Sequence, residues 1–193
     1  MFDFSIERSQ DSGIKSSIYC CYGMPYAAFV YCIVSVIAYS VWAFRFVSES
    51  GPMFASIAVV YLVLSGFSLS GLVYKPRVVL QFCIFFALAF LVYTIFWCLF
   101  WFGLKGQYYA DLYGSFVGLA VLTWLFMKVF GKNTGFLPFF SVLFTCHTLG
   151  YYMGGEGYAL VGGPFGRLLW GVGHGLGFGA GLGYLITRCQ EAD

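Results

Sequence analysis

Long apolar runs repeat along almost the whole chain, separated by short breaks that contain charged residues, glycine or proline. A bilayer core about 30 Å thick is crossed by roughly 20 apolar residues in an α-helix. The runs have that length and are apolar on every face, and the breaks between them predict six membrane-spanning helices. The predicted spans are Pro25 to Val47, Pro52 to Tyr74, Val78 to Gly103, Tyr108 to Phe130, Phe136 to Tyr152 and Pro164 to Thr187.

This pattern predicts an all-α, polytopic membrane protein. Residues 1–24 form a predicted N-terminal tail, residues 25–187 the transmembrane bundle and residues 188–193 a C-terminal tail. Closed β-barrels also span membranes, but their strands alternate apolar and polar residues over about ten positions, which these runs do not. The connections are short, so consecutive helices are expected to be antiparallel neighbours. One longer, glycine-rich outer loop is predicted over Met153 to Gly163.

The composition agrees with a membrane protein, because 61% of the residues are hydrophobic and only 9% are charged. Soluble domains carry about a quarter charged residues. The net charge of +2 offers no basic surface for a nucleic acid. Seven Lys and Arg residues fall on the predicted side of the two termini and three on the other. The positive-inside rule therefore places both termini inside, in the cytoplasm of a bacterium or the matrix of a mitochondrion.

Glycine occupies every second position in the last predicted span. The seven glycines are Gly171, Gly173, Gly175, Gly177, Gly179, Gly181 and Gly183. On an α-helix they form two ridges on nearly opposite faces, since 3.6 residues make a turn. Small residues let helices in lipid approach closely, so this helix is expected to pack between two neighbours. Both neighbours belong to the same chain, or one of them belongs to a second copy or another subunit.

The segment from residue 167 to residue 190 resembles the glycine-ladder helix of the small cristae-organising subunit of the mitochondrial MICOS complex. The resemblance rests on Arg167 and Trp170 before the ladder, and on Tyr184 and Cys189-Gln190 after it. It implies oligomerisation through the ladder and a place in the mitochondrial inner membrane. It covers about 24 residues of the chain, and that family has two helices rather than six spans. A shorter motif of the same kind, Gly114 and Gly118, lies in the fourth predicted span.

Ionisable residues inside a membrane span are functional candidates by default. The two histidines of the chain, His147 and His174, both lie in predicted spans. Joint ligation of a haem is the sharpest hypothesis for them, but the predicted span ends put them about 7 Å apart in depth at 1.5 Å per residue. A structural hydrogen bond is therefore favoured for each. Glu156 and Arg167, in and beside the predicted outer loop, are further candidates, as an ion pair or as the lining of a substrate entrance.

No metal site and no enzyme motif is predicted. The seven cysteines form no CxxC pair and most lie in apolar runs, which argues against a zinc site or a disulfide framework. Three functions remain open. The favoured one is a structural or accessory subunit that packs into a larger membrane assembly, or with itself, through the glycine-ladder helix. The second is a small channel or transporter for a neutral or lipidic substrate, and the third is a membrane enzyme or haem protein.

Overall fold

Regular structure in the protein is entirely helical over the residues that the computed structural model describes, which are 13–73 and 79–191, with side chains from residue 22 onward. The helices are α1 (Gly13–Ala43), α2 (Ser50–Leu69), the short 3₁₀ helix η2 (Ser70–Leu72), α3 (Val79–Gly103), α4 (Ala110–Val129), α5 (Phe136–Val161) and α6 (Gly163–Cys189). The prediction of an all-α fold is confirmed.

Within residues 13–73 and 79–191, four helical segments are long and apolar enough to cross a membrane. They are Tyr22–Ala43, Ser50–Leu72, Val79–Gly103 and Ala110–Val129. This agrees with an integral membrane protein. The last two helices, α5 with 26 residues and α6 with 27, are longer than α4, but they are not among these four segments.

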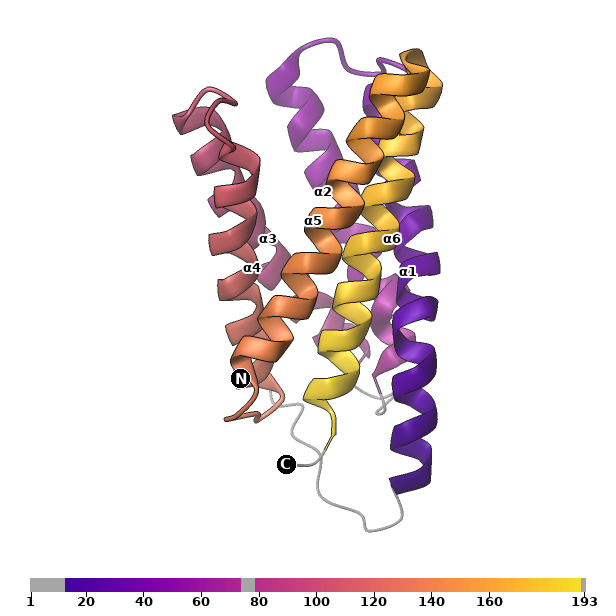
Figure 1. Ribbon diagram of the computed structural model, residues 1–193, viewed down its shortest axis with the longest axis vertical. Helices are drawn as coiled ribbons and strands as arrows, with labels where there is room; N and C mark the ends of the chain where they lie inside the picture. Colours follow the sequence, from indigo (N-terminus) through magenta and orange to yellow (C-terminus); the bar gives the residue numbers. More distant parts are fainter. Residues whose placement is uncertain (1–12, 74–78, 192–193) are drawn as a thin grey trace.

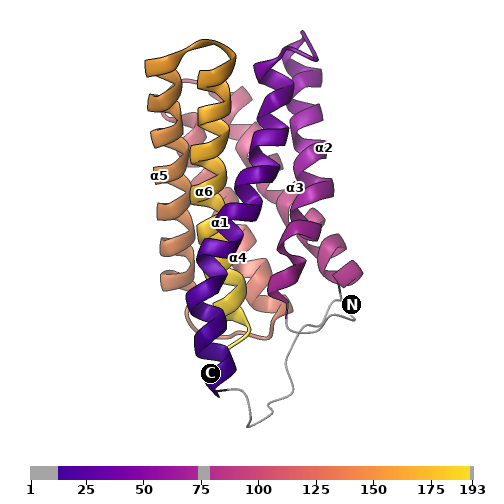
Figure 2. The same ribbon diagram turned by 90° about the vertical axis from the view of Figure 1, so that its right-hand side faces the viewer.

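The helices form a ring in which α6 lies between α1 and α5. From α1 the ring continues through α2, α3 and α4 back to α5, each helix packing on the next. Figures 1 and 2 show the long helices running side by side, with the start of α1 and the end of α6 at the same end of the bundle. The opposite end carries the α1–α2, α3–α4 and α5–α6 connections.

Two helices extend beyond their predicted spans, and the predicted loop between the last two helices is wrong. The fifth helix does not end at Tyr152 but continues to Val161, so the predicted loop from Met153 to Gly163 is almost wholly helical and Gly162 alone connects α5 to α6. Glycine is a poor helix former in water, but Gly150 and Gly154 lie within α5 and pack directly on α6. The first helix begins at Gly13, inside the predicted tail, and Pro25 lies within it instead of starting it.

The two glycine ridges of α6 face different helices of the same chain. A Cβ atom built on Gly175 would lie 2.6 Å from the Cα atom of Cys32 in α1. One built on Gly173 would lie 2.7 Å from the Cα atom of Gly154 in α5. The remaining glycines continue the two rows: Gly171, Gly179 and Gly183 face α1, and Gly177 and Gly181 face α5. Both ridges are therefore occupied within one chain.

The Gly114 and Gly118 pair makes a similar close contact between α4 and α3. A Cβ on Gly114 would lie 2.9 Å from the Cα atom of Trp97, and one on Gly118 would lie 3.0 Å from the carbonyl oxygen of Tyr93. Because a side chain at either position would push α3 away, these glycines set where Tyr93 and Trp97 sit.

Candidate functional site

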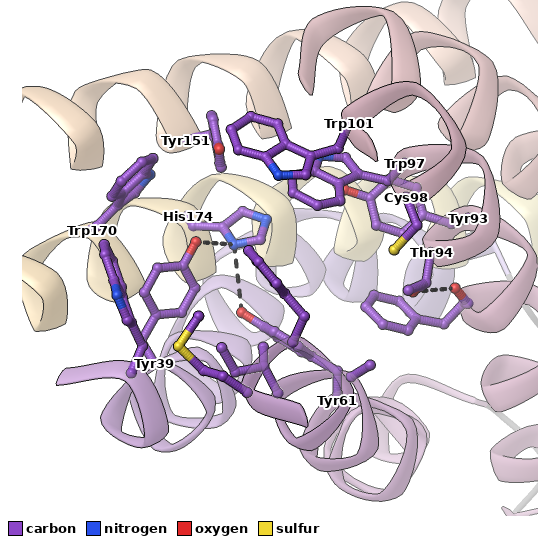
Figure 3. A pocket seen from close by; sticks show the side chains of 16 residues that line it. Tyr39, Tyr61, Tyr93, Thr94, Trp97, Cys98, Trp101, Tyr151, Trp170 and His174 are labelled. Atoms are coloured by element: carbon purple, nitrogen blue, oxygen red, sulfur yellow. Dashed lines mark hydrogen bonds between the residues drawn. The ribbon is translucent and has the colours of Figure 1, made fainter. Parts of the chain in front are cut away.

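A partly open cavity of about 320 Å³ lies between the helices, in the half of the bundle that carries the α5–α6 connection. Figure 3 shows the side chains that line it. Ten of the sixteen are Phe, Tyr or Trp, and none is Asp, Glu, Lys or Arg. The lining residues are Tyr39 and Trp42 of α1, Met53, Phe54, Ile57, Ala58 and Tyr61 of α2, Phe90, Tyr93, Thr94, Trp97, Cys98 and Trp101 of α3, Tyr151 of α5, and Trp170 and His174 of α6.

His174 is the most polar group in this lining. Its side chain is buried, with 9% of its surface exposed. Its Nδ1 atom lies 3.4 Å from the hydroxyl oxygens of both Tyr39 and Tyr61 (Figure 3). The Tyr61 hydroxyl also shares a 2.7 Å hydrogen bond with Ser35 of α1. Side chains of α1 and α2 therefore fix the orientation of the His174 ring.

His147 lies directly beside His174. The ring centroids are 5.1 Å apart and the ring planes are nearly perpendicular, at 88°. The Nε2 atom of His147 lies 3.0 Å from the Tyr93 hydroxyl, and only 2% of the residue is exposed. The predicted depth difference of about 7 Å is wrong, because it was counted from Tyr152, where α5 does not end.

Phe178, one turn after His174 on α6, supports both imidazole rings from below the cavity. Its ring centroid is 4.9 Å from that of His147 and 5.7 Å from that of His174. It also contacts the Tyr93 ring at 5.4 Å. The two histidines and their tyrosine partners thus belong to one packed aromatic cluster.

The glycine ladder explains why this cluster can form. His174 stands between Gly173, which lies against α5, and Gly175, which lies against α1. Because neither neighbour has a side chain, both helices come close enough to bring Tyr39 and His147 to the His174 ring. The glycine ladder therefore positions the side chains of the site, in addition to packing α6 against α1 and α5.

Three buried nitrogens in this region lack a hydrogen-bond partner among the described residues: Nε2 of His174, Nδ1 of His147 and Nε1 of Trp170. Leaving a buried donor or acceptor unpaired costs about 1–3 kcal/mol. Two of the three residues, His174 and Trp170, line the cavity.

The other two predicted polar candidates lie elsewhere, and neither lines the cavity. Glu156 is exposed on α5. Arg167 of α6 donates hydrogen bonds from one nitrogen to the carbonyl oxygens of Trp42, at 3.1 Å, and Ala43, at 3.4 Å. Its guanidinium also lies 5.0 Å from the centre of the Trp42 ring. Arg167 therefore caps the C-terminal end of α1, where the helix dipole favours a positive charge.

Two ligands of one haem iron lie on opposite faces of the porphyrin, whereas the rings of His147 and His174 contact each other directly. This arrangement leaves no room for a porphyrin between them. Among the described residues, no group of three or more His, Cys, Asp or Glu side chains could hold a metal ion. The described lining of the cavity is aromatic and carries the hydroxyl groups of Tyr39 and Tyr61 beside His174.

The sequence does not predict the aromatic lining, because its side chains come from five different helices. A signal was present, since Trp42, Trp97, Trp101 and Trp170 all fall in the predicted outer halves of their spans. Antiparallel packing of those spans brings the four indoles to one level.

No family model, curated protein or solved structure matches this chain. The resemblance of the last helix to the MICOS subunit thus stays a prediction.

Proposed function

We propose that this protein is a small multi-pass membrane transporter or carrier that takes neutral, largely apolar molecules from the bilayer into the aromatic cavity. The observation that carries the proposal is the cavity itself, with its volume of about 320 Å³ and no Asp, Glu, Lys or Arg among the described residues that line it. Ligand pockets in proteins measure roughly 300–1,000 Å³ and are mostly apolar with a few placed polar groups.

The absence of charge in the lining selects the class of substrate. An ion brought into this cavity would lose its water without gaining an opposite charge from the sixteen lining residues, which is costly. A neutral molecule with a ring or a hydrocarbon chain would instead gain contact with aromatic walls. A lipid-soluble substrate fits this chemistry best.

The same proposal includes six membrane crossings, with both termini inside. In support, α5 and α6 have 26 and 27 residues, about 40 Å at 1.5 Å per residue, and both pack along the bundle. The distribution of Lys and Arg then puts the cavity in the outer half of the membrane, either the bacterial cytoplasmic membrane or the mitochondrial inner membrane.

A role as an assembly subunit would need a different surface from the one predicted. The rows formed by Gly171 to Gly183 and by Gly173 to Gly181 are covered by α1 and α5 of the same chain. Association with another subunit would have to use an outer, lipid-facing surface. The cavity is for this reason the stronger basis for a function.

Quenching of tryptophan fluorescence tests the proposal, because four of the five tryptophans line the cavity. The fifth, Trp124, is 50% exposed on α4 and is replaced by Phe to remove its signal. Bromobenzene, a neutral heavy-atom quencher, is titrated into this Trp124→Phe protein in proteoliposomes. A bound quencher gives a saturable decrease in fluorescence, whereas collisions in the lipid give one that rises linearly with concentration.

Two neighbouring substitutions on α2 provide the matched comparison. Ala58 lines the cavity, and Ala58→Phe fills part of it. Val59 is 57% exposed on the outer surface, so Val59→Phe adds a ring there. We expect saturable quenching with Val59→Phe and its loss with Ala58→Phe. Equal, non-saturable quenching in all proteins would refute the proposed function.

A further inference from the structure

We propose that the cavity opens sideways into the bilayer between α2 and α3, and that it binds the head of a neutral lipid whose hydrocarbon chain leaves through this opening. The inference rests on the proposed function and adds the class of ligand, which is a compact, uncharged ring or head group on one long chain. It follows from the way in which α2 and α3 separate along their length.

The two helices touch closely near the end of the bundle that carries both termini. A Cβ atom built on Gly66 of α2 would lie 2.8 Å from the Cα atom of Cys83 in α3 and 3.1 Å from its carbonyl oxygen. Small residues permit such a close approach of helices in lipid. The α2–α3 interface is therefore closed at this level.

The same sides of the two helices no longer meet farther from that end. Eleven residues make three turns of an α-helix to within about 20°, so Ala55 points to the same side of α2 as Gly66, and Thr94 to the same side of α3 as Cys83. Both lie about 16 Å from the close contact at 1.5 Å per residue. Yet Ala55 is exposed, and Thr94 is partly exposed and lines the cavity. At this level a gap between α2 and α3 leads from the outer surface to the cavity.

Small side chains border this gap on both helices. Ala55 and Ala58 stand on α2, and Ala58 lines the cavity. Thr94 and Cys98, one helical turn apart, stand on α3, and Figure 3 shows both on the cavity wall. All four are exposed or partly exposed. We call the opening between these four residues the side window.

Large rings close the interface again toward the α1–α2 connection. The Phe54 ring of α2 packs against Trp97 and Phe102 of α3, with centroids 6.1 and 6.0 Å apart. The side window is therefore bounded by the close backbone contact on one side and by aromatic rings on the other. It faces the bilayer, not the water beyond the ends of the helices.

The cavity is too short for a long chain. Its lining runs from Met53 to Tyr61 on α2 and from Phe90 to Trp101 on α3, which is about 12–16 Å at 1.5 Å per residue. Its aromatic walls suit a ring. A hydrocarbon chain is in similarly apolar surroundings in lipid and in a protein interior, so the chain of a bound lipid need not enter the cavity. The side window lets it stay in the bilayer.

Two quenchers that differ only in a hydrocarbon chain test this inference. Bromobenzene is shorter than the cavity, whereas an extended molecule of 1-bromo-4-dodecylbenzene is longer than it. Each is titrated into the Trp124→Phe protein in proteoliposomes, and the mole fraction of quencher in the lipid at half saturation is measured. We expect the two values to agree within about threefold, because the chain remains in the bilayer.

A variant that narrows the side window separates the two probes. Ala55→Phe adds a ring at an exposed position that does not line the cavity. It should raise the half-saturating mole fraction of the dodecyl compound by about tenfold or more, because the added ring overfills the path of the chain. Saturable quenching by bromobenzene should be retained, which also shows that the variant is folded. Ala159→Phe, the same change at an exposed position of α5, is the control and should leave both values unchanged.

The outcomes separate this inference from the proposed function. Saturable quenching by bromobenzene alone would overturn the side window and leave the proposed function standing. An unchanged value for the dodecyl compound in Ala55→Phe, or an equal loss in Ala159→Phe, would overturn it as well. Non-saturable quenching by both probes would refute the proposed function and the inference together.

Discussion

Replacing Gly175 by alanine should separate α6 from α1. The new Cβ atom would lie 2.6 Å from the Cα atom of Cys32, 2.7 Å from the Cβ atom of Ser35 and 3.0 Å from the carbonyl oxygen of Tyr31. Carbon atoms in contact lie about 3.5–4.0 Å apart, so α1 has to move by about 1 Å. The atoms in the way belong to the backbone or are attached to it, and no side-chain rotation relieves the clash.

The cost can be set against the usual benefit of alanine in a helix. Overpacking of a close contact costs about 1–3 kcal/mol, while alanine is favoured over glycine in a helix by about 1 kcal/mol. We expect a net loss of up to about 2 kcal/mol in the free energy of unfolding. The same movement would carry Tyr39 away from His174 and weaken ligand binding in the cavity.

Gly157→Ala is the matched control. Gly157 is also within a helix, α5, and its added Cβ atom would lie 3.6 Å from the Cβ atom of Leu169, an ordinary contact. This variant should be neutral or more stable by about 0.5–1 kcal/mol. Unfolding of both proteins is followed by circular dichroism during titration of a mild detergent with dodecyl sulfate. Equal stability of Gly175→Ala and Gly157→Ala would refute the close packing of α6 on α1.

Two more results are expected. Arg167→Ala should lower the free energy of unfolding by about 1–2 kcal/mol in the same titration, because it removes the hydrogen bonds to the end of α1 and the contact with the Trp42 ring. Glu156→Gln, at an exposed position, should change this free energy little. A loss for Glu156→Gln as large as that for Arg167→Ala would contradict the structural role assigned to Arg167. If all six helices cross the membrane, an impermeant maleimide added to intact cells should label Ser48→Cys and Leu160→Cys but not Asn133→Cys, as judged by the mass of the purified protein. Labelling of Ser48→Cys without labelling of Leu160→Cys would contradict six crossings, because Leu160 lies outside only if α5 crosses the membrane.

The sequence pattern was sufficient for the helical class because an apolar run of about 20 residues has few other folds in lipid. It also indicated two packing faces on the last helix, since alternate glycines separate into two rows on a helix. Which neighbour covers each row depends on contacts across the bundle, such as Gly173 against Gly154, and these are not encoded locally.

The sequence predicts some residues of the site but not how they come together, because that also depends on contacts across the bundle. Ionisable residues in apolar runs drew attention to His147 and His174, but their mutual contact depends on where α5 ends. That end was misplaced because glycines in the segment after Tyr152 were read as a loop, whereas in a membrane helix glycine also serves close packing. The aromatic wall comes from five helices, and no single stretch of sequence reveals it.

The location of a bound ligand tests the central claim most directly. An experimental structure of the protein with 2-bromonaphthalene bound would place the bromine atom by its anomalous scattering. We predict a single strong bromine peak among Trp97, Tyr61 and His174, inside the aromatic cavity. Bromine found only on the outer, lipid-facing surfaces, with the cavity empty, would contradict the account.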